Sequence, residues 1–197
     1  METKRIVFVG VGGQGNLLVT RLLGEACLAA GIPAVLSEIH GMAQRGGIVE
    51  SAVVMGGATS PIVSNGEADI LVGFEPLETL RALNKCNRNS VVIVNVHPLP
   101  PFTVAIGQGT YPDVDMALET IRNSVSSVIA LDGEEMAAKA GNPLSLNMVM
   151  LGALVGSKIL PVDGDLLKET ITKSTKKAFL ESNLKAFDFG VAAAGAG

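Results

Sequence analysis

Short apolar runs alternate along the chain with stretches in which apolar residues recur every three or four positions. The runs have the length and composition of buried strands, and the spaced stretches predict helices. Strands are expected at residues 5–10, 33–39, 48–56, 68–74, 90–97 and 126–132. Helices are expected at residues 15–30, 75–86, 113–123, 133–141 and 142–159, with one or two more between 163 and 190. This order predicts one α/β domain with a mainly parallel sheet flanked by helices.

The beginning of the chain predicts a Rossmann-like unit. A strand, a glycine-rich turn, a helix and a second strand follow one another, so strands 5–10 and 33–39 should be parallel. The pattern is modified after the second strand, where "HGMAQRGG" at 40–47 stands in place of a helix. We expect the domain to span residues 1–190, and the small-residue segment "VAAAGAG" at 191–197 to be a disordered tail.

The glycine turn is a candidate anion site. The motif G-x-G-x-x-G lies between a strand and a helix, where glycines let the backbone approach an anion and the helix offers free N–H groups. Gly13 and Gln14 stand at its apex, where backbone amides and one side-chain amide could reach a pyrophosphate. A tight turn without a ligand is the alternative. The candidate residues are Gly10, Gly12, Gly13, Gln14, Gly15 and Asn16.

A second candidate group follows the second strand. Parallel α/β sheets bind ligands at the carboxyl ends of their strands, so this segment should converge with the glycine turn. Glu38 stands where dinucleotide-binding domains carry a ribose-binding acid, although a solvated strand-end carboxylate is the commoner case. The Arg45 guanidinium could bind phosphate or carboxylate, or belong to an exposed loop. The residues of this group are Glu38, Gln44, Arg45, Gly46 and Gly47.

The amino-acid composition limits the kinds of molecule that this chain is expected to bind. Charged residues make up 17% of the chain, against about 25% in typical soluble domains, so we infer that another protein covers part of the surface. The net charge of -4 and the 4% of aromatic residues argue against a nucleic-acid ligand. No signal-peptide pattern and no apolar run of about 20 residues is present, so we expect a cytoplasmic protein outside the membrane.

The counts of cysteine and histidine limit the chemistry. The two cysteines, Cys27 and Cys86, cannot supply the four thiolates that iron–sulfur clusters usually need. The two histidines, His40 and His97, form no zinc pattern, and we expect neither a metal site nor catalytic residues on this chain.

Nearly the whole sequence resembles the gamma subunit or gamma domain of 2-oxoacid:ferredoxin oxidoreductases, with the indolepyruvate-type enzymes as the nearest branch. The resemblance is carried by "GVGGQG", "SEIHGMAQRGGIVESAVV", "GEADILVGFEPLETLRAL", "VIVNVHPLPP", "VIALDGEEMAAKAGNP", "NMVMLGALVG" and "KKAFLESNLKAFDFG". The segment "VVMGG" departs from the family, which often has a basic residue at or near Val54.

The resemblance implies oxidative decarboxylation of a 2-oxo acid to an acyl-CoA with reduction of ferredoxin. It implies that thiamine diphosphate, magnesium and iron–sulfur clusters lie on a larger partner subunit. This chain would then contribute a domain that binds coenzyme A or phosphate and an interface. Asn147, a polar residue in an apolar helix, is a weaker candidate contact.

Two other functions stay open on the residues alone. An NAD(P)-dependent dehydrogenase would use Glu38 for the cofactor and His97 for proton transfer. A non-enzymatic nucleotide-binding module would need no partner, and it would leave the low charge unexplained.

Overall fold

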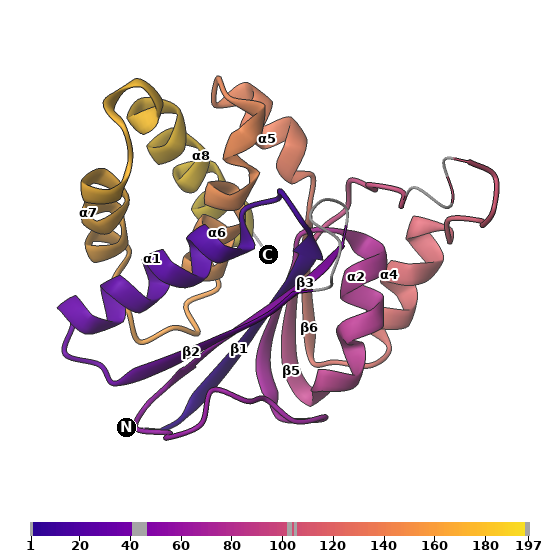
Figure 1. Ribbon diagram of the computed structural model, residues 1–197, viewed down its shortest axis with the longest axis horizontal. Coiled ribbons are helices and arrows are strands. Elements are labelled where there is room, and N and C mark those ends of the chain that lie inside the picture. The colour runs from indigo at the N-terminus through magenta and orange to yellow at the C-terminus, as the bar shows by residue number, and fades with distance from the viewer. Residues whose placement is uncertain (1, 41–46, 102–103, 105, 196–197) are drawn as a thin grey trace.

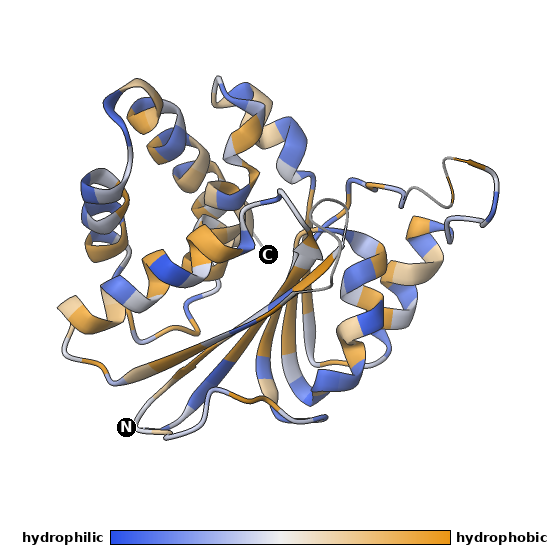
Figure 2. Ribbon diagram, viewed as in Figure 1, coloured by the Kyte–Doolittle hydropathy of each residue, from blue (hydrophilic) through white to orange (hydrophobic). Residues whose placement is uncertain are grey.

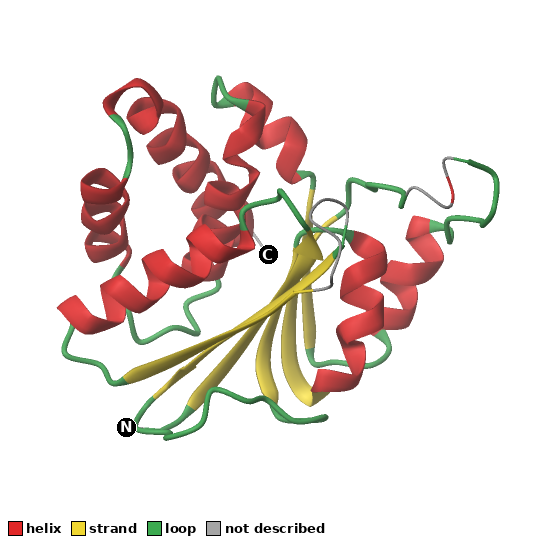
Figure 3. Ribbon diagram, viewed as in Figure 1, coloured by secondary structure: helices red, strands yellow, loops and turns green. Residues whose placement is uncertain are grey.

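Six strands form one twisted sheet at the centre of the computed structural model, which describes residues 2–40, 47–101, 104 and 106–195 (Figure 1, Figure 3). The strands are β1 (Lys4–Val11), β2 (Ala34–His40), β3 (Ile48–Met55), β4 (Ala68–Gly73), β5 (Cys86–Asn95) and β6 (Ser127–Leu131). Their order across the sheet is β2-β3-β1-β4-β5-β6. The α/β class predicted from the sequence is confirmed.

The sheet is modified at β3, as the sequence predicts, but in a specific way. β1, β4, β5 and β6 are mutually parallel, whereas β3 lies antiparallel between β1 and β2. β1 and β2 therefore run in the same direction, as expected of a βαβ unit, without being hydrogen-bonded neighbours. The reversed β3 begins at the sheet edge where β1 ends, since Val11 pairs with Ile48.

Successive strand residues point alternately into two hydrophobic cores, one on each face of the sheet. Apolar residues concentrate along the strands (Figure 2). Ile6 and Phe8 face the first core, and Val7 and Val9 face the second. The first face carries α1 (Asn16–Ala29), α5 (Gly133–Lys139), η2 (Pro143–Ser145), α6 (Leu146–Gly156), α7 (Gly164–Ser174) and α8 (Lys177–Gly195). The second carries α2 (Pro76–Arg81), η1 (Ala82–Lys85) and α4 (Val114–Arg122), which pack near β1, β4, β5 and β6.

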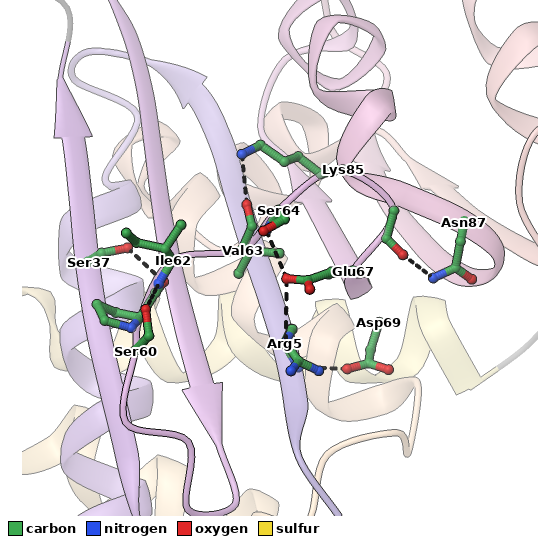
Figure 4. A network of polar contacts seen from close by, with 12 residues as sticks. Arg5, Ser37, Ser60, Ile62, Val63, Ser64, Glu67, Asp69, Lys85 and Asn87 are labelled. Carbon is green, nitrogen blue, oxygen red and sulfur yellow. Dashed lines mark hydrogen bonds and ion pairs between the residues drawn. The ribbon is translucent and has the colours of Figure 1, made fainter.

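A non-helical strap, residues 57–67, covers the second face over β1 and β3. Its Val63 is buried in the second core, and the Lys85 ammonium donates to the Val63 carbonyl over 2.9 Å (Figure 4). The Ser37 hydroxyl of β2 donates to the Pro61 carbonyl over 3.2 Å. The Glu67 carboxylate accepts from the Ser64 N–H over 3.0 Å. The strap therefore occupies part of the place that a helix between β2 and β3 would fill in a doubly wound domain.

Helices α6 and α8 pack backbone against backbone through glycines. A Cβ added to Gly190 of α8 would lie 2.0 Å from the Val149 carbonyl oxygen of α6. A Cβ added to Gly152 of α6 would lie 2.0 Å from the Phe187 carbonyl oxygen. This contact also corrects the expectation of a disordered tail for residues 191–195, because α8 continues to Gly195 and buries Ala194. Residues 196 and 197 lie outside the described residues. Small side chains at the end of α8 permit close packing there.

The described helices are too short or too polar to cross a membrane.

We expect Gly190→Ala to lower the free energy of unfolding by about 3 kcal/mol or more, because the new methyl group meets main-chain atoms that cannot rotate away. Gly195→Ala is the matched control, since a Cβ there has no neighbour within 4 Å. Urea unfolding of both variants measures the difference, and equal stabilities would contradict the close packing.

Candidate functional site

The glycine turn and the return into β3 meet at the carboxyl edge of the sheet. The Gly12 N–H donates to the Gly47 carbonyl over 2.9 Å, which confirms that the two predicted segments converge. Gln44, Arg45 and Gly46 lie outside the described residues, so their predicted roles stay predictions.

Only part of the turn is free to bind a ligand. The Gln14 N–H donates to the Val11 carbonyl over 3.1 Å, and the Gly12 N–H is bonded as described. Within the described part of the chain, the N–H groups of Gly13, Gly15 and Asn16 have no acceptor, and no side chain caps α1. These unpaired donors lie where the partial positive charge of a helix start is expected.

The Gln14 side chain is part of the fold instead of a free ligand contact. Its Oε1 accepts from the Val11 N–H over 2.8 Å, and its Nε2 donates to the Phe74 carbonyl over 3.0 Å. The amide therefore closes the turn and ties β1 to the end of β4. This differs from the sequence-based expectation that the side chain could reach a pyrophosphate, because the oxygen and the nitrogen of the amide are both bonded to the main chain of the domain.

Asn95 continues this connection to β5 and α5. The fully buried side chain donates from Nδ2 to the same Phe74 carbonyl over 2.9 Å. Its Oδ1 accepts from the Gly133 N–H over 2.9 Å, at the start of α5. Two side-chain amides, Gln14 and Asn95, thus hold the ends of β1, β4 and β5 together. Sequence reasoning missed Asn95; an uncharged polar residue ending an otherwise apolar strand was the available signal.

Position 15 requires glycine for two reasons, its backbone conformation and the lack of space for a side chain. Its φ of 89° lies in the left-handed region, and a Cβ there would lie 2.5 Å from the Asn147 Nδ2 atom. Asn147, the weaker candidate, therefore lies against the turn. Gly10 faces inward, because a Cβ there would lie 2.7 Å from Gln14 Oε1. The side chain of Asn16 is buried and its Oδ1 has no partner among the described residues.

Glu38 lies away from the glycine turn. β3 separates its strand from β1, and strands in a sheet are spaced about 4.8 Å apart. Glu38 instead lines a shallow groove with Thr20, Arg21, Leu36 and Ser37. In dinucleotide-binding domains the ribose-binding acid follows the strand next to the glycine turn, so this position does not support that role.

A buried carboxylate fixes the segment that follows β5. Glu75 is 1% exposed and caps α2, accepting from the Glu78 N–H over 2.9 Å. Its other oxygen accepts from the Leu99 N–H over 3.2 Å and from the Tyr111 hydroxyl. Burial, followed by the hydrogen bond to Glu75 and its charge, raises the pKa of Tyr111 above its usual range. Glu75 thus anchors residues 99 and 111 to the end of β4.

One group of side chains has the chemistry of metal ligands. His97, Asp132 and Glu134 each place a ligand atom within 4.8 Å of the others. Burial raises the pKa of the Glu134 carboxyl, whose Oε2 has no partner among the described residues. The group joins the ends of β5 and β6, so no local spacing in the sequence indicated it. His97 is exposed and the two carboxylates are half-buried, and we assign no metal to this group.

We expect Asn95→Ala to lower the free energy of unfolding by about 2–4 kcal/mol, because it leaves the Gly133 N–H unpaired and removes one donor from Phe74. The control is Asn123→Ala at an exposed position on the C-cap of α4. Chemical denaturation compares the two, and a loss at Asn95 no larger than at Asn123 would refute the role of this amide.

Tyr111→Phe should cost about 1.5–3 kcal/mol at pH 8, because the buried Glu75 carboxylate loses a donor. Since folding raises the Tyr111 pKa, this contribution is complete below the ordinary tyrosine pKa of about 10 and is lost as pH rises through the folded-state value. Unfolding measured from pH 8 to pH 11 should therefore show the two proteins converging. A constant difference would contradict this.

The sequence of this chain matches a known protein family over almost its whole length. Residues 5–193 match the family model described as pyruvate ferredoxin/flavodoxin oxidoreductase. The chain is 41% identical over 189 residues to the indolepyruvate oxidoreductase subunit IorB of Methanothermobacter thermautotrophicus, covering 96% of each protein.

Two solved structures share the fold. The keto/oxoacid ferredoxin oxidoreductase gamma subunit of Geobacter sulfurreducens superposes with a TM-score of 0.71 at 24% identity, over 98% of this chain and 99% of that one. The 2-oxoglutarate:ferredoxin oxidoreductase of Magnetococcus marinus, solved with 2-oxoglutarate, coenzyme A and succinyl-CoA bound, gives a TM-score of 0.75 at 22% identity. That match covers all of this chain but 32% of the longer one. The structures share the fold, and the match of residues 5–193 to the family model, with the 41% identity to IorB, shows that the chain belongs to the pyruvate ferredoxin/flavodoxin oxidoreductase family.

Proposed function

We propose that this chain is the non-redox subunit of an indolepyruvate-type 2-oxoacid:ferredoxin oxidoreductase. The enzyme would decarboxylate a 2-oxo acid, reduce ferredoxin and transfer the acyl group to coenzyme A. The match to an indolepyruvate oxidoreductase subunit over 96% of both proteins supports the type of enzyme. Under this proposal the complex works in the cytoplasm.

The proposal that this chain binds coenzyme A rests on the start of α1, which no side chain caps. Gly13, Gly15 and Asn16 have N–H groups without acceptors among the described residues, at the edge where β3 begins. Coenzyme A carries a pyrophosphate, and such donors at a helix start fit one of its phosphate oxygens. Gln14 positions this turn from behind through Val11 and Phe74. The bound coenzyme would supply the thiol that accepts the acyl group.

The redox chemistry is assigned to a large partner subunit. The chain has two cysteines, and burial raises the pKa of both the Cys27 and the Cys86 thiol to about 11. Neutral, separated thiols are poor cluster ligands. We therefore place thiamine diphosphate, magnesium and iron–sulfur clusters on the partner, with ferredoxin reached through the complex.

The dehydrogenase and the free-standing nucleotide-binding module are not supported. A carboxylate that binds the ribose of a nicotinamide cofactor has to lie close to the glycine turn. Glu38 does not, because β3 lies between its strand and β1. The family match extends over residues 5–193 and concerns subunits of oxidoreductases.

The test compares Gly13→Asp with Gly13→Asn in the complex with the large subunit. Both side chains are similar in size, and a Cβ at Gly13 has no neighbour within 4 Å, so any cost of its φ of 106° is shared. The carboxylate should repel a phosphate and raise the KM for coenzyme A about tenfold over the amide variant, or about 1.4 kcal/mol.

Equal KM values for the two variants would exclude phosphate binding at the turn. The isolated chain, supplied with thiamine diphosphate, a 2-oxo acid, coenzyme A and ferredoxin, should show no ferredoxin reduction. Activity of this chain alone would overturn the division of labour between the subunits.

A further inference from the structure

β2 is one of the two outer strands of the sheet. The backbone groups on its outer side have no partner strand in the described part of the chain. Edge strands of free-standing domains are usually blocked by charges, prolines or bulges. The seven residues of β2, "AVLSEIH", contain one acidic residue, Glu38, and no proline.

Exposed apolar side chains flank this edge on the second face. Ile39 of β2 is 62% exposed, Ile48 of β3 is 48% exposed, and Ile62 of the strap is 74% exposed. Strand alternation places Ile39 with Val35, and Ile48 with Ala52 and Val54, on the face of the second core. On that face α2 packs near β1, β4 and β5 and α4 packs near β6, at the other side of the sheet from β2 (Figure 1). The strap reaches β2 through the hydrogen bond from Ser37 to Pro61.

The first face of the same edge is also apolar. Leu36 is 42% exposed and lines the groove of about 300 Å³ between β2 and α1. Leu17 and Leu18 are exposed one helical turn before Arg21, which lines that groove, so they extend the apolar surface toward the glycine turn. We name the residues Leu17, Leu18, Leu36, Ile39, Ile48 and Ile62 the β2-edge patch.

We propose that the β2-edge patch is the surface on which this subunit docks to the large subunit of the oxidoreductase, an inference that rests on the proposed function. In the 2-oxoglutarate:ferredoxin oxidoreductase the same fold makes up 32% of a longer chain, so the rest of that chain is held beside it covalently. A separate chain needs a surface to replace this covalent attachment. The patch supplies apolar area, the low charge of the chain agrees with a covered face, and its position beside the turn brings the partner to the proposed ligand site.

The experiment uses the full chain and the large thiamine- and iron–sulfur-containing subunit from the same organism. Ile39→Lys combined with Ile62→Lys should weaken their association by about tenfold or more, because two lysines would be buried at the interface. Leu28→Lys combined with Leu144→Lys is the matched control, since those side chains are 81% and 83% exposed and lie outside the patch. Thermal unfolding of each isolated variant establishes that it folds, and the binding constant is measured by titration.

Hydrogen exchange gives a second readout. Amides of residues 34–40 should exchange more slowly in the wild-type complex than in the isolated chain. Unchanged affinity in the patch variant, with unchanged exchange in β2, would overturn the docking surface while leaving the proposed function intact. Failure of the wild-type chain to bind the large subunit would instead overturn the proposed function. Self-association of the isolated chain, abolished by the patch variant, would show a second copy as the occupant and refute the proposal.

Discussion

The carbonyl of Phe74 is the acceptor on which the carboxyl edge of the sheet depends. It receives one N–H from Gln14 and one from Asn95, and each of these amides uses its oxygen to bind a backbone N–H elsewhere. A buried main-chain carbonyl can accept two hydrogen bonds, and here both come from side chains of different elements. These four hydrogen bonds hold the glycine turn, the end of β4 and the start of α5 in one arrangement.

This arrangement determines which backbone N–H groups of the turn can still bind an anion. The turn satisfies the N–H groups of Gly12 and Gln14 internally. Those of Gly13, Gly15 and Asn16 have no acceptor among the described residues, so the surface offered to an anion is small. Small anion sites at helix starts bind modestly unless neighbouring protein excludes water, because solvent weakens each electrostatic contact. Apolar side chains beside the turn would bring such a neighbour, and binding and docking would then reinforce one another.

The sequence was informative where a feature is local. Short segments of sequence predict the glycine turn and the succession of strands and helices along the chain. General rules of parallel sheets predict that Gly12 and Gly47 meet. The place of β3 between β1 and β2 was not predictable, because strand order depends on contacts between distant segments. The side-chain direction of Gln14 depends on Phe74, sixty residues away. The last residues of α8 looked disordered because they are small, yet small residues are what the contact with α6 requires.

The reversal of β3 changes what the connection before it has to span. In a doubly wound sheet the segment after the second strand must cross the sheet through a helix, and its length is constrained by that crossing. Here β2 and β3 are antiparallel neighbours, so the segment between them only has to join adjacent strand ends. Its length is therefore set by the distance between neighbouring strand ends and not by a helical crossing. The hydrogen bond from the Gly12 N–H to the Gly47 carbonyl then holds the last residue of this segment against the glycine turn.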